Sequence, residues 1–157
     1  MDFTLDSPAF ADHAPIPRAH TCEGADASPP LRWSGAPPST QSFALIVDDP
    51  DAPDPRAPTA TWVHWVLYNI PATAHALPAN AGLDGPPGVG RGRNDWRRDG
   101  YGGPCPPIGR HRYFFTLFAL DAMLPNLGHP TKADLLAAMR GHVLAQTQLV
   151  GTYQKGR

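Results

Sequence analysis

The sequence has little charge, and it has no long apolar run. Charged residues make up 17% of the 157 residues, and 13 basic against 14 acidic side chains leave a formal net charge of −1. This balance gives no electrostatic reason to bind nucleic acid or a membrane surface. No apolar run approaches the length of a membrane-spanning helix, so we expect no transmembrane segment.

Cysteine is also scarce. Cys22 and Cys105 are too few for a disulfide-dense secreted scaffold, and they do not form a CxxC pair. The N-terminal stretch MDFTLDSPAF has neither a basic n-region nor an apolar h-region, so we expect no signal peptide. The default expectation is a cytoplasmic protein with both thiols reduced, although the sequence alone leaves a single bridge open.

What the chain does contain is apolar residues and turn formers. Hydrophobic residues account for 41%, which suits one globular domain over residues 1–157. There are 15 glycines and 20 prolines. So many turn formers argue against a helical bundle and favour a β-rich fold with many turns.

Runs of β-branched and aromatic residues predict the strands. The three strong runs are residues 42–48, 61–70 and 112–120. Weaker or shorter ones are residues 3–6, 31–34 and 149–154. The turn-prone DDPDAPDP is expected to stop the first strong strand, and residues 71–107 read mostly as loop. We expect four arginines in that loop to be solvated: Arg91, Arg93, Arg97 and Arg98.

One helix is clear in the sequence, and it is expected over residues 131–146. Thr131 can cap it, and Asp134 follows three residues later as in a capping box. Its apolar stripe at helical spacing consists of Leu135, Leu136, Met139 and Val143. This helix should cover one face of the sheets.

Three strongly predicted segments carry residues that could form a site. Asp49 follows the first strong strand, His64 lies within the second and His111 stands at the start of the third. Strict alternation would place His64 on the face of Trp62 and Val66, with Trp65 on the other. Alone, each histidine is more often a satisfied core residue. If the three strands are neighbours, however, the carboxylate and both imidazoles converge.

Such a group suits a small anion. Imidazoles supply N–H donors, a carboxylate behind an imidazole fixes its tautomer, and Gly102 and Gly103 permit a nest of backbone N–H groups. A metal site ranks second, because no motif such as HExxH is present. Nucleophilic catalysis is weakly supported, since there is no GxSxG elbow and a free cysteine such as Cys105 is usually inert.

These segments, read together, resemble the phosphatidylethanolamine-binding protein family, in particular its bacterial and archaeal Raf kinase inhibitor-like branch. The resemblance extends over nearly the whole chain, from HTCEG and SPPLRWSG to LVGTYQ. Its most specific part is the order of DPDAP, a strand carrying histidine, and GPCPPIGRHRY.

The resemblance implies two packed antiparallel sheets with a few peripheral helices, and a pocket for phosphate or phosphorylated groups. Carried over by position, the pocket residues would be Asp49, Asp51, His64, Gly103, Pro104, His111 and Tyr113. No cofactor is implied.

The sequence departs from the animal pattern in two places. Val63 stands where animal members often carry a second histidine, and animal members continue with a helix beyond the LVGTYQ strand. We therefore carry over the anion pocket and leave kinase inhibition and lipid binding aside. The expected function is a binding protein with a small anion pocket for phosphate or phosphorylated ligands, with a regulatory role through a phosphoprotein or a small phospho-ligand. A homodimer is expected as well. The alternative is a hydrolase, with or without a metal, that uses Asp49 and His64.

Overall fold

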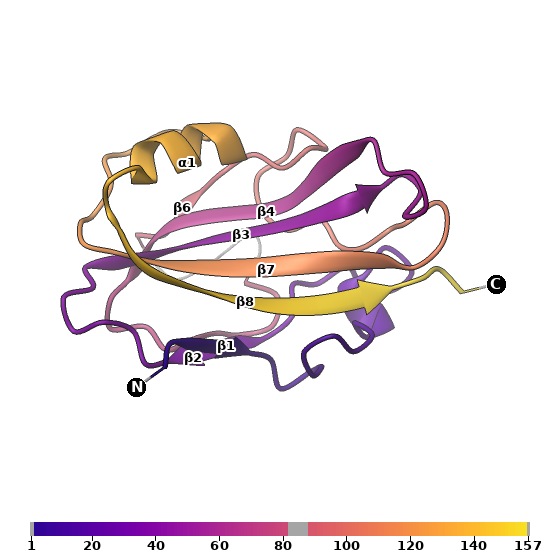
Figure 1. Ribbon diagram of the computed structural model, residues 1–157, viewed down its shortest axis with the longest axis horizontal. Coiled ribbons are helices and arrows are strands. Elements are labelled where there is room, and N and C mark those ends of the chain that lie inside the picture. Colours follow the sequence, from indigo (N-terminus) through magenta and orange to yellow (C-terminus); the bar gives the residue numbers. More distant parts are fainter. Residues whose placement is uncertain (1, 82–87, 157) are drawn as a thin grey trace.

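The structure, a computed structural model, describes residues 2–81 and 88–156, which form two antiparallel sheets packed on one another (Figure 1). The larger sheet has the strand order β6-β4-β3-β7-β8, and the smaller has the order β1-β2-β5. The larger sheet's strands are β3 (Ser42–Ala52), β4 (Ala60–Pro71), β6 (Gly90–Arg91), β7 (His111–Leu120) and β8 (Val143–Tyr153). The smaller sheet's strands are β1 (Thr4–Asp6), β2 (Leu31–Ser34) and β5 (Ala76–Leu77). The predicted mainly-β fold of two packed sheets is confirmed.

The main core lies between the two sheets because their strands alternate apolar side chains toward each other. Val47 of β3 pairs with Trp65 of β4 on one side and with Phe115 of β7 on the other, and all three are almost completely buried. Leu31 and Trp33 of β2 meet this layer from the smaller sheet. These contacts fix which face of the large sheet is the inner one.

The outer face of the large sheet is covered by α1 (Lys132–Met139), seen above β4 and β6 in Figure 1. Thr131 caps this helix through the expected capping box with Asp134. Leu135 and Met139 pack into a second apolar cluster with Val66 of β4. The helix therefore covers a sheet face as predicted. A 3₁₀ turn, η1 (Arg18–His20), is the other helical element in the described ranges.

The C-terminal elements differ from the prediction. The helix ends at Met139 and not at residue 146, and the last strand starts at Val143 and not at residue 149. Gly141 has a φ of 83°, and a glycine in this left-handed region commonly ends a helix. Val143 of the predicted stripe belongs to β8, so the apolar spacing was carried past the true end of the helix. Leu136 lies within the helix but is exposed.

The first strong strand also runs further than predicted. β3 continues through the acidic segment to Ala52, with a register shift between Asp49 and Ala52. A bulge of this kind tolerates Pro50, which has no N–H for the ladder. The four arginines of the predicted loop, residues 71–107, are exposed, as expected. That loop is mostly irregular, with β5 and β6 within it, and its residues 82–87 lie outside the described ranges.

Candidate functional site

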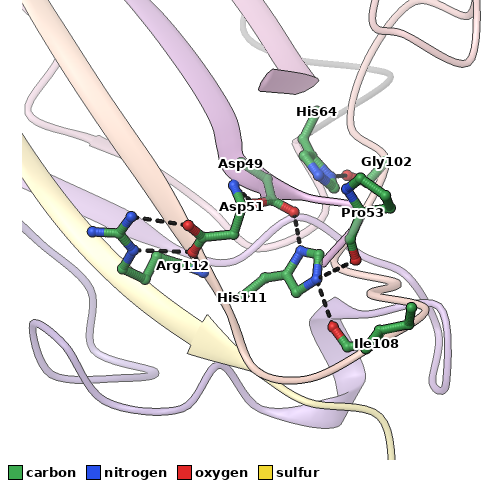
Figure 2. Close-up of polar contacts among 8 residues, drawn as sticks. All are labelled: Asp49, Asp51, Pro53, His64, Gly102, Ile108, His111 and Arg112. Carbon is green, nitrogen blue, oxygen red and sulfur yellow. Dashed lines mark hydrogen bonds and ion pairs between the residues drawn. The ribbon is translucent and has the colours of Figure 1, made fainter. Parts of the chain in front are cut away.

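The candidate residues come from the ends of three adjacent strands and from one loop. β3 lies between β4 and β7, so the condition for convergence, that the three strands are neighbours, is met. Asp49, His64 and His111 meet at one end of the large sheet, next to Gly102 of the glycine-proline loop (Figure 2). The convergence expected from the sequence therefore exists.

A cavity of about 320 Å³ opens among these residues. Four predicted site residues line it: Asp49, His64, His111 and Tyr113. Its other walls are Ala52, Pro53, Trp62, Trp96, Cys105, Pro106 and Pro107. The remaining predicted residues, Asp51, Gly103 and Pro104, support these walls without lining the cavity.

A bulge in β4 turns His64 toward the cavity. Two consecutive residues of β3 pair with Trp65 and Val63, so His64 is the extra residue between them. The bulge resets the alternation: Trp62 and His64 line the cavity, Trp65 lies in the core between the sheets, and Val66 lies in the outer cluster. The expectation that Val66 shares the face of His64 was therefore wrong.

His64 is buried and is held twice by one glycine. Its Nδ1 donates to the Gly102 carbonyl at 2.7 Å, and the Gly102 N–H donates to the His64 carbonyl at 3.0 Å. Burial lowers the pKa of His64 to about 4, against the opposing effect of the Gly102 hydrogen bond. Near neutral pH the ring is therefore uncharged, with its proton on Nδ1 and a lone pair on Nε2.

Asp49 and His111 form a buried pair. His111 Nδ1 lies 2.6 Å from Asp49 Oδ2, and Nε2 lies 3.0 Å and 2.8 Å from the carbonyls of Pro53 and Ile108. Carbonyls only accept, so Nε2 carries one hydrogen, and the contact with Asp49 holds a second. Burial raises the pKa of Asp49, and the bond from His111 opposes that rise. The pair thus holds two protons without net charge, and both nitrogens of His111 are engaged within the protein.

Asp51 points to a different partner. Its carboxylate accepts from Arg112 at Nε (3.0 Å) and at Nη2 (2.9 Å), and from the Arg112 backbone N–H (2.9 Å). These bonds lower the pKa of Asp51. The Arg112 guanidinium also lies 5.4 Å from the centre of the Phe114 ring. This ion pair joins the ends of β3 and β7 outside the cavity.

Gly102 and Gly103 can pack closely against their neighbours only because they have no side chains. A Cβ on Gly102 would lie 2.3 Å from the Trp96 ring, and a Cβ on Gly103 would lie 2.3 Å from Asp26 Oδ1. Alanine at either position would have to displace its neighbours. The two glycines therefore let the loop pack between Trp96 and Asp26.

The two cysteines form a disulfide, which corrects the expectation that both thiols are reduced. Cys22 follows the 3₁₀ turn, Cys105 lies in the cavity wall, and 83 residues separate them in sequence. The Cys22 N–H also donates to the Pro104 carbonyl at 3.1 Å. The bridge fixes the wall of the pocket to the N-terminal segment. Sequence spacing could not reveal this pairing, because the fold alone brings the two residues together.

Tyr113 and Trp62 line the cavity, and each has a buried polar atom without a hydrogen-bond partner among the described residues: the Tyr113 hydroxyl and Trp62 Nε1. Tyr113 is almost fully buried, and burial raises its pKa, so the hydroxyl keeps its proton. Trp96 stacks edge-on against His64 and Trp62, with ring centroids 5.0 Å and 5.6 Å away. Sequence reasoning missed Trp62 and Trp96 as wall residues, although Trp62 stands two residues from His64, which was a usable signal.

The described ranges contain no group of three or more His, Cys, Asp or Glu side chains arranged to hold a metal ion. In the same ranges, no helix is long and apolar enough to cross a membrane.

Comparison with known proteins agrees with this fold. Residues 6–154 match the model of the phosphatidylethanolamine-binding protein family. A UPF0098 protein of Methanothermobacter thermautotrophicus is 47% identical over 154 residues, covering 97% of this chain and 99% of that protein. The crystal structure of CT736 from Chlamydia trachomatis, titled a putative family homologue, superposes with a TM-score of 0.90 at 39% identity, covering 98% of both chains. The structure of Escherichia coli YbcL, titled a new member of the mammalian family, gives 0.89 at 33% identity and covers 99% of this chain and 100% of that one.

The two-sheet β fold with a pocket at the strand ends is thus the fold of a family of binding proteins. The chain belongs to the phosphatidylethanolamine-binding protein family.

Proposed function

We propose that the pocket binds a small phosphate-type anion, either inorganic phosphate or the phosphate group of a phosphorylated ligand. The observation that carries the proposal is the Tyr113 hydroxyl, which is buried at the cavity wall without an acceptor among the described residues. A buried donor without a partner is costly, so such a group in a pocket wall suits a ligand that accepts hydrogen bonds. Trp62 Nε1 is a second donor of the same kind.

The charge of the pocket favours an anion that carries a proton. Asp49 does not repel an anion, because its pair with His111 has no net charge. The neutral His64 ring offers a lone pair at Nε2, and the monoanion of a phosphate has an O–H that can donate to it. Sulfate has no such proton, so it should need a protonated His64. Its affinity should therefore rise only as the pH falls toward the low pKa of His64.

The test is titration of the protein with methyl phosphate near pH 6, followed by NMR of the histidine and tryptophan rings. Resonances of His64 and Trp62 should move at millimolar ligand. Tyr113→Phe removes the hydroxyl and keeps the ring, and we expect it to lose roughly tenfold in affinity because the lost bond is made to a charged acceptor.

Tyr68→Phe is the matched control. Tyr68 is an equally buried tyrosine of β4, but it lies in the outer cluster, and its hydroxyl accepts a hydrogen bond from the Leu127 N–H at 3.0 Å. This variant should bind as the wild type does. Equal affinity in Tyr113→Phe and wild type, or no response of the His64 ring, would place the anion elsewhere.

The hydrolase alternative needs Asp49 as a general base. Its Oδ2 is bonded to His111, and its Oδ1 accepts from the Asp51 N–H at 2.7 Å. Both oxygens are thus engaged within the protein, and we favour binding without turnover.

The regulatory role through a phosphoprotein or a small phospho-ligand and the homodimer stay predictions. So does the cytoplasmic location. The feature that counts against that location is the Cys22–Cys105 bridge, because disulfides persist mainly in oxidising compartments.

A further inference from the structure

One peptide group connects the pocket histidine to a carboxylate outside the pocket. The Gly102 carbonyl accepts from His64 Nδ1 at 2.7 Å (Figure 2). The N–H of the same peptide unit belongs to Gly103 and donates to Asp26 Oδ1 at 2.9 Å. Asp26 and His64 thus bond to opposite ends of a single peptide dipole.

The backbone conformation and the neighbouring residues hold Asp26 in contact with this peptide. Asp26 has a φ of 58°, a left-handed conformation that aspartate tolerates better than most residues. The space that a Cβ on Gly103 would need is taken by Asp26 Oδ1 and the His20 carbonyl. The Tyr101 hydroxyl also donates to the His20 carbonyl at 2.7 Å. The segment that carries Asp26 is therefore held against the glycine loop from several directions.

Asp26 is reached from a separate cavity. It lines a polar space of about 210 Å³ with Ser28, Asn80, Asn94, Arg98, Asp99 and Tyr101, none of which lines the ligand pocket. The Gly102–Gly103 peptide therefore stands between two cavities, with His64 on one side and Asp26 on the other.

We propose that Asp26 is a positioning residue of the pocket, which acts on His64 through the Gly102–Gly103 peptide. A carboxylate at the N–H end of a peptide increases the negative charge on the carbonyl oxygen at its other end, because hydrogen bonds in a chain polarise one another. The stronger carbonyl acceptor holds the His64 proton on Nδ1 and keeps Nε2 directed to the ligand. A carboxylate bonded directly to a metal-ligating histidine fixes its tautomer in the same way.

Several charged and titratable groups surround the hydrogen bonds that join Asp26 to His64. Asp49 of β3 and His111 and Tyr113 of β7 line the pocket with His64, and the Tyr113 ring lies 5.1 Å from the His64 ring. Arg98 and Asp99 share the cavity of Asp26. Burial raises the pKa of Asp26, and the bond from Gly103 and the charge of Arg98 oppose this rise.

The test removes the negative charge of Asp26 and keeps its hydrogen bond from the Gly103 N–H. In Asp26→Asn, the amide oxygen can still accept from Gly103 and asparagine tolerates the positive φ, but the negative charge is gone. Asp99→Asn is the matched control, because Asp99 lines the same cavity and bonds to His129 and not to Gly103. The first readout is the NMR resonance of the His64 Nδ1 proton without ligand.

We expect this proton to move upfield in Asp26→Asn and to stay in place in Asp99→Asn. In the wild type the resonance should also follow the acid titration of Asp26, and that pH dependence should vanish in Asp26→Asn. An unchanged resonance in Asp26→Asn would overturn the proposal. If that variant does not fold, a wild-type resonance that does not follow the titration of the Asp26 carboxyl would overturn it equally.

The second readout is binding of methyl phosphate, and this arm rests on the proposed function. We expect Asp26→Asn to lose roughly threefold in affinity, less than the tenfold or more contributed by carboxylates bonded directly to metal-ligating histidines. Wild-type affinity in this variant would count against the proposal. The two ideas fail separately: if wild type binds no phosphate, the anion proposal is wrong, while the ligand-free resonance still decides the role of Asp26.

Discussion

Removing the disulfide between Cys22 and Cys105 should destabilise the folded protein, because the cross-link restricts the unfolded chain. The double variant Cys22→Ser/Cys105→Ser removes the cross-link and leaves the Cys22 N–H to Pro104 hydrogen bond available. With a sequence separation of 83 between the cysteines, the loss of chain entropy in the unfolded state corresponds to about 4.5 kcal/mol at 25 °C. For a chain of this length, such a loss should lower Tm by roughly 10 °C or more.

Urea unfolding monitored by tryptophan fluorescence measures the difference directly. The wild type under oxidising conditions is compared with the double variant and with the wild type in dithiothreitol, which should behave alike. Thiol alkylation under denaturing conditions first establishes that the oxidised protein has no free thiol. If the oxidised protein and the double variant then differ by less than about 1 kcal/mol, the loop-entropy reasoning is wrong for this chain.

Two further predictions concern the pocket. Gly103→Ala should destabilise the fold by roughly 1–3 kcal/mol, because its Cβ would lie 2.3 Å from Asp26 Oδ1; thermal unfolding measures this, and an unchanged Tm would mean that the loop has room to move. The second concerns pH. The pKa of His64 is lowered from 6.5 to about 4 in the folded protein. Between pH 6.5 and 4, the unfolded chain therefore binds a proton at this histidine that the folded protein does not bind. The wild type should therefore lose about 3 kcal/mol more stability than His64→Gln as the pH falls from 6.5 to 4, and parallel stability profiles of the two proteins would contradict a buried neutral His64.

Much of the fold could be predicted because the strands of the large sheet carry a strong local signal. The runs around Val47, Trp65 and Phe115 are β-branched and aromatic, and these three residues pair in one layer of the core. The convergence of Asp49, His64 and His111 followed once those strands were taken as neighbours. The helix end could also have been predicted, since Gly141 directly after Arg140 is a common stop signal.

Other features depend on three-dimensional packing and leave no mark on local sequence. The bulge at His64 adds one residue to β4, and periodicity alone does not show where an extra residue falls. The partners of His111 could not be read from the sequence for a related reason. Its Nε2 is engaged by the carbonyls of Pro53 and Ile108, and backbone carbonyls are present at every position of any sequence. Only the structure shows which of them reach the ring.

The charges at this end of the sheet bear on how the pocket would select an anion. Side chains of β7 alternate, so that His111 and Tyr113 line the cavity while Arg112 bonds to Asp51 outside it. Among the residues that the structure describes, the cavity wall contains no lysine or arginine. An anion in this pocket would meet neutral donors, a neutral acid–base pair and an uncharged imidazole. Hydrogen-bond geometry and the proton carried by the ligand would then select it, more than its net charge. This also gives the proposed role of Asp26 its importance, because recognition in a pocket without a lysine or arginine depends on which nitrogen of His64 holds the proton.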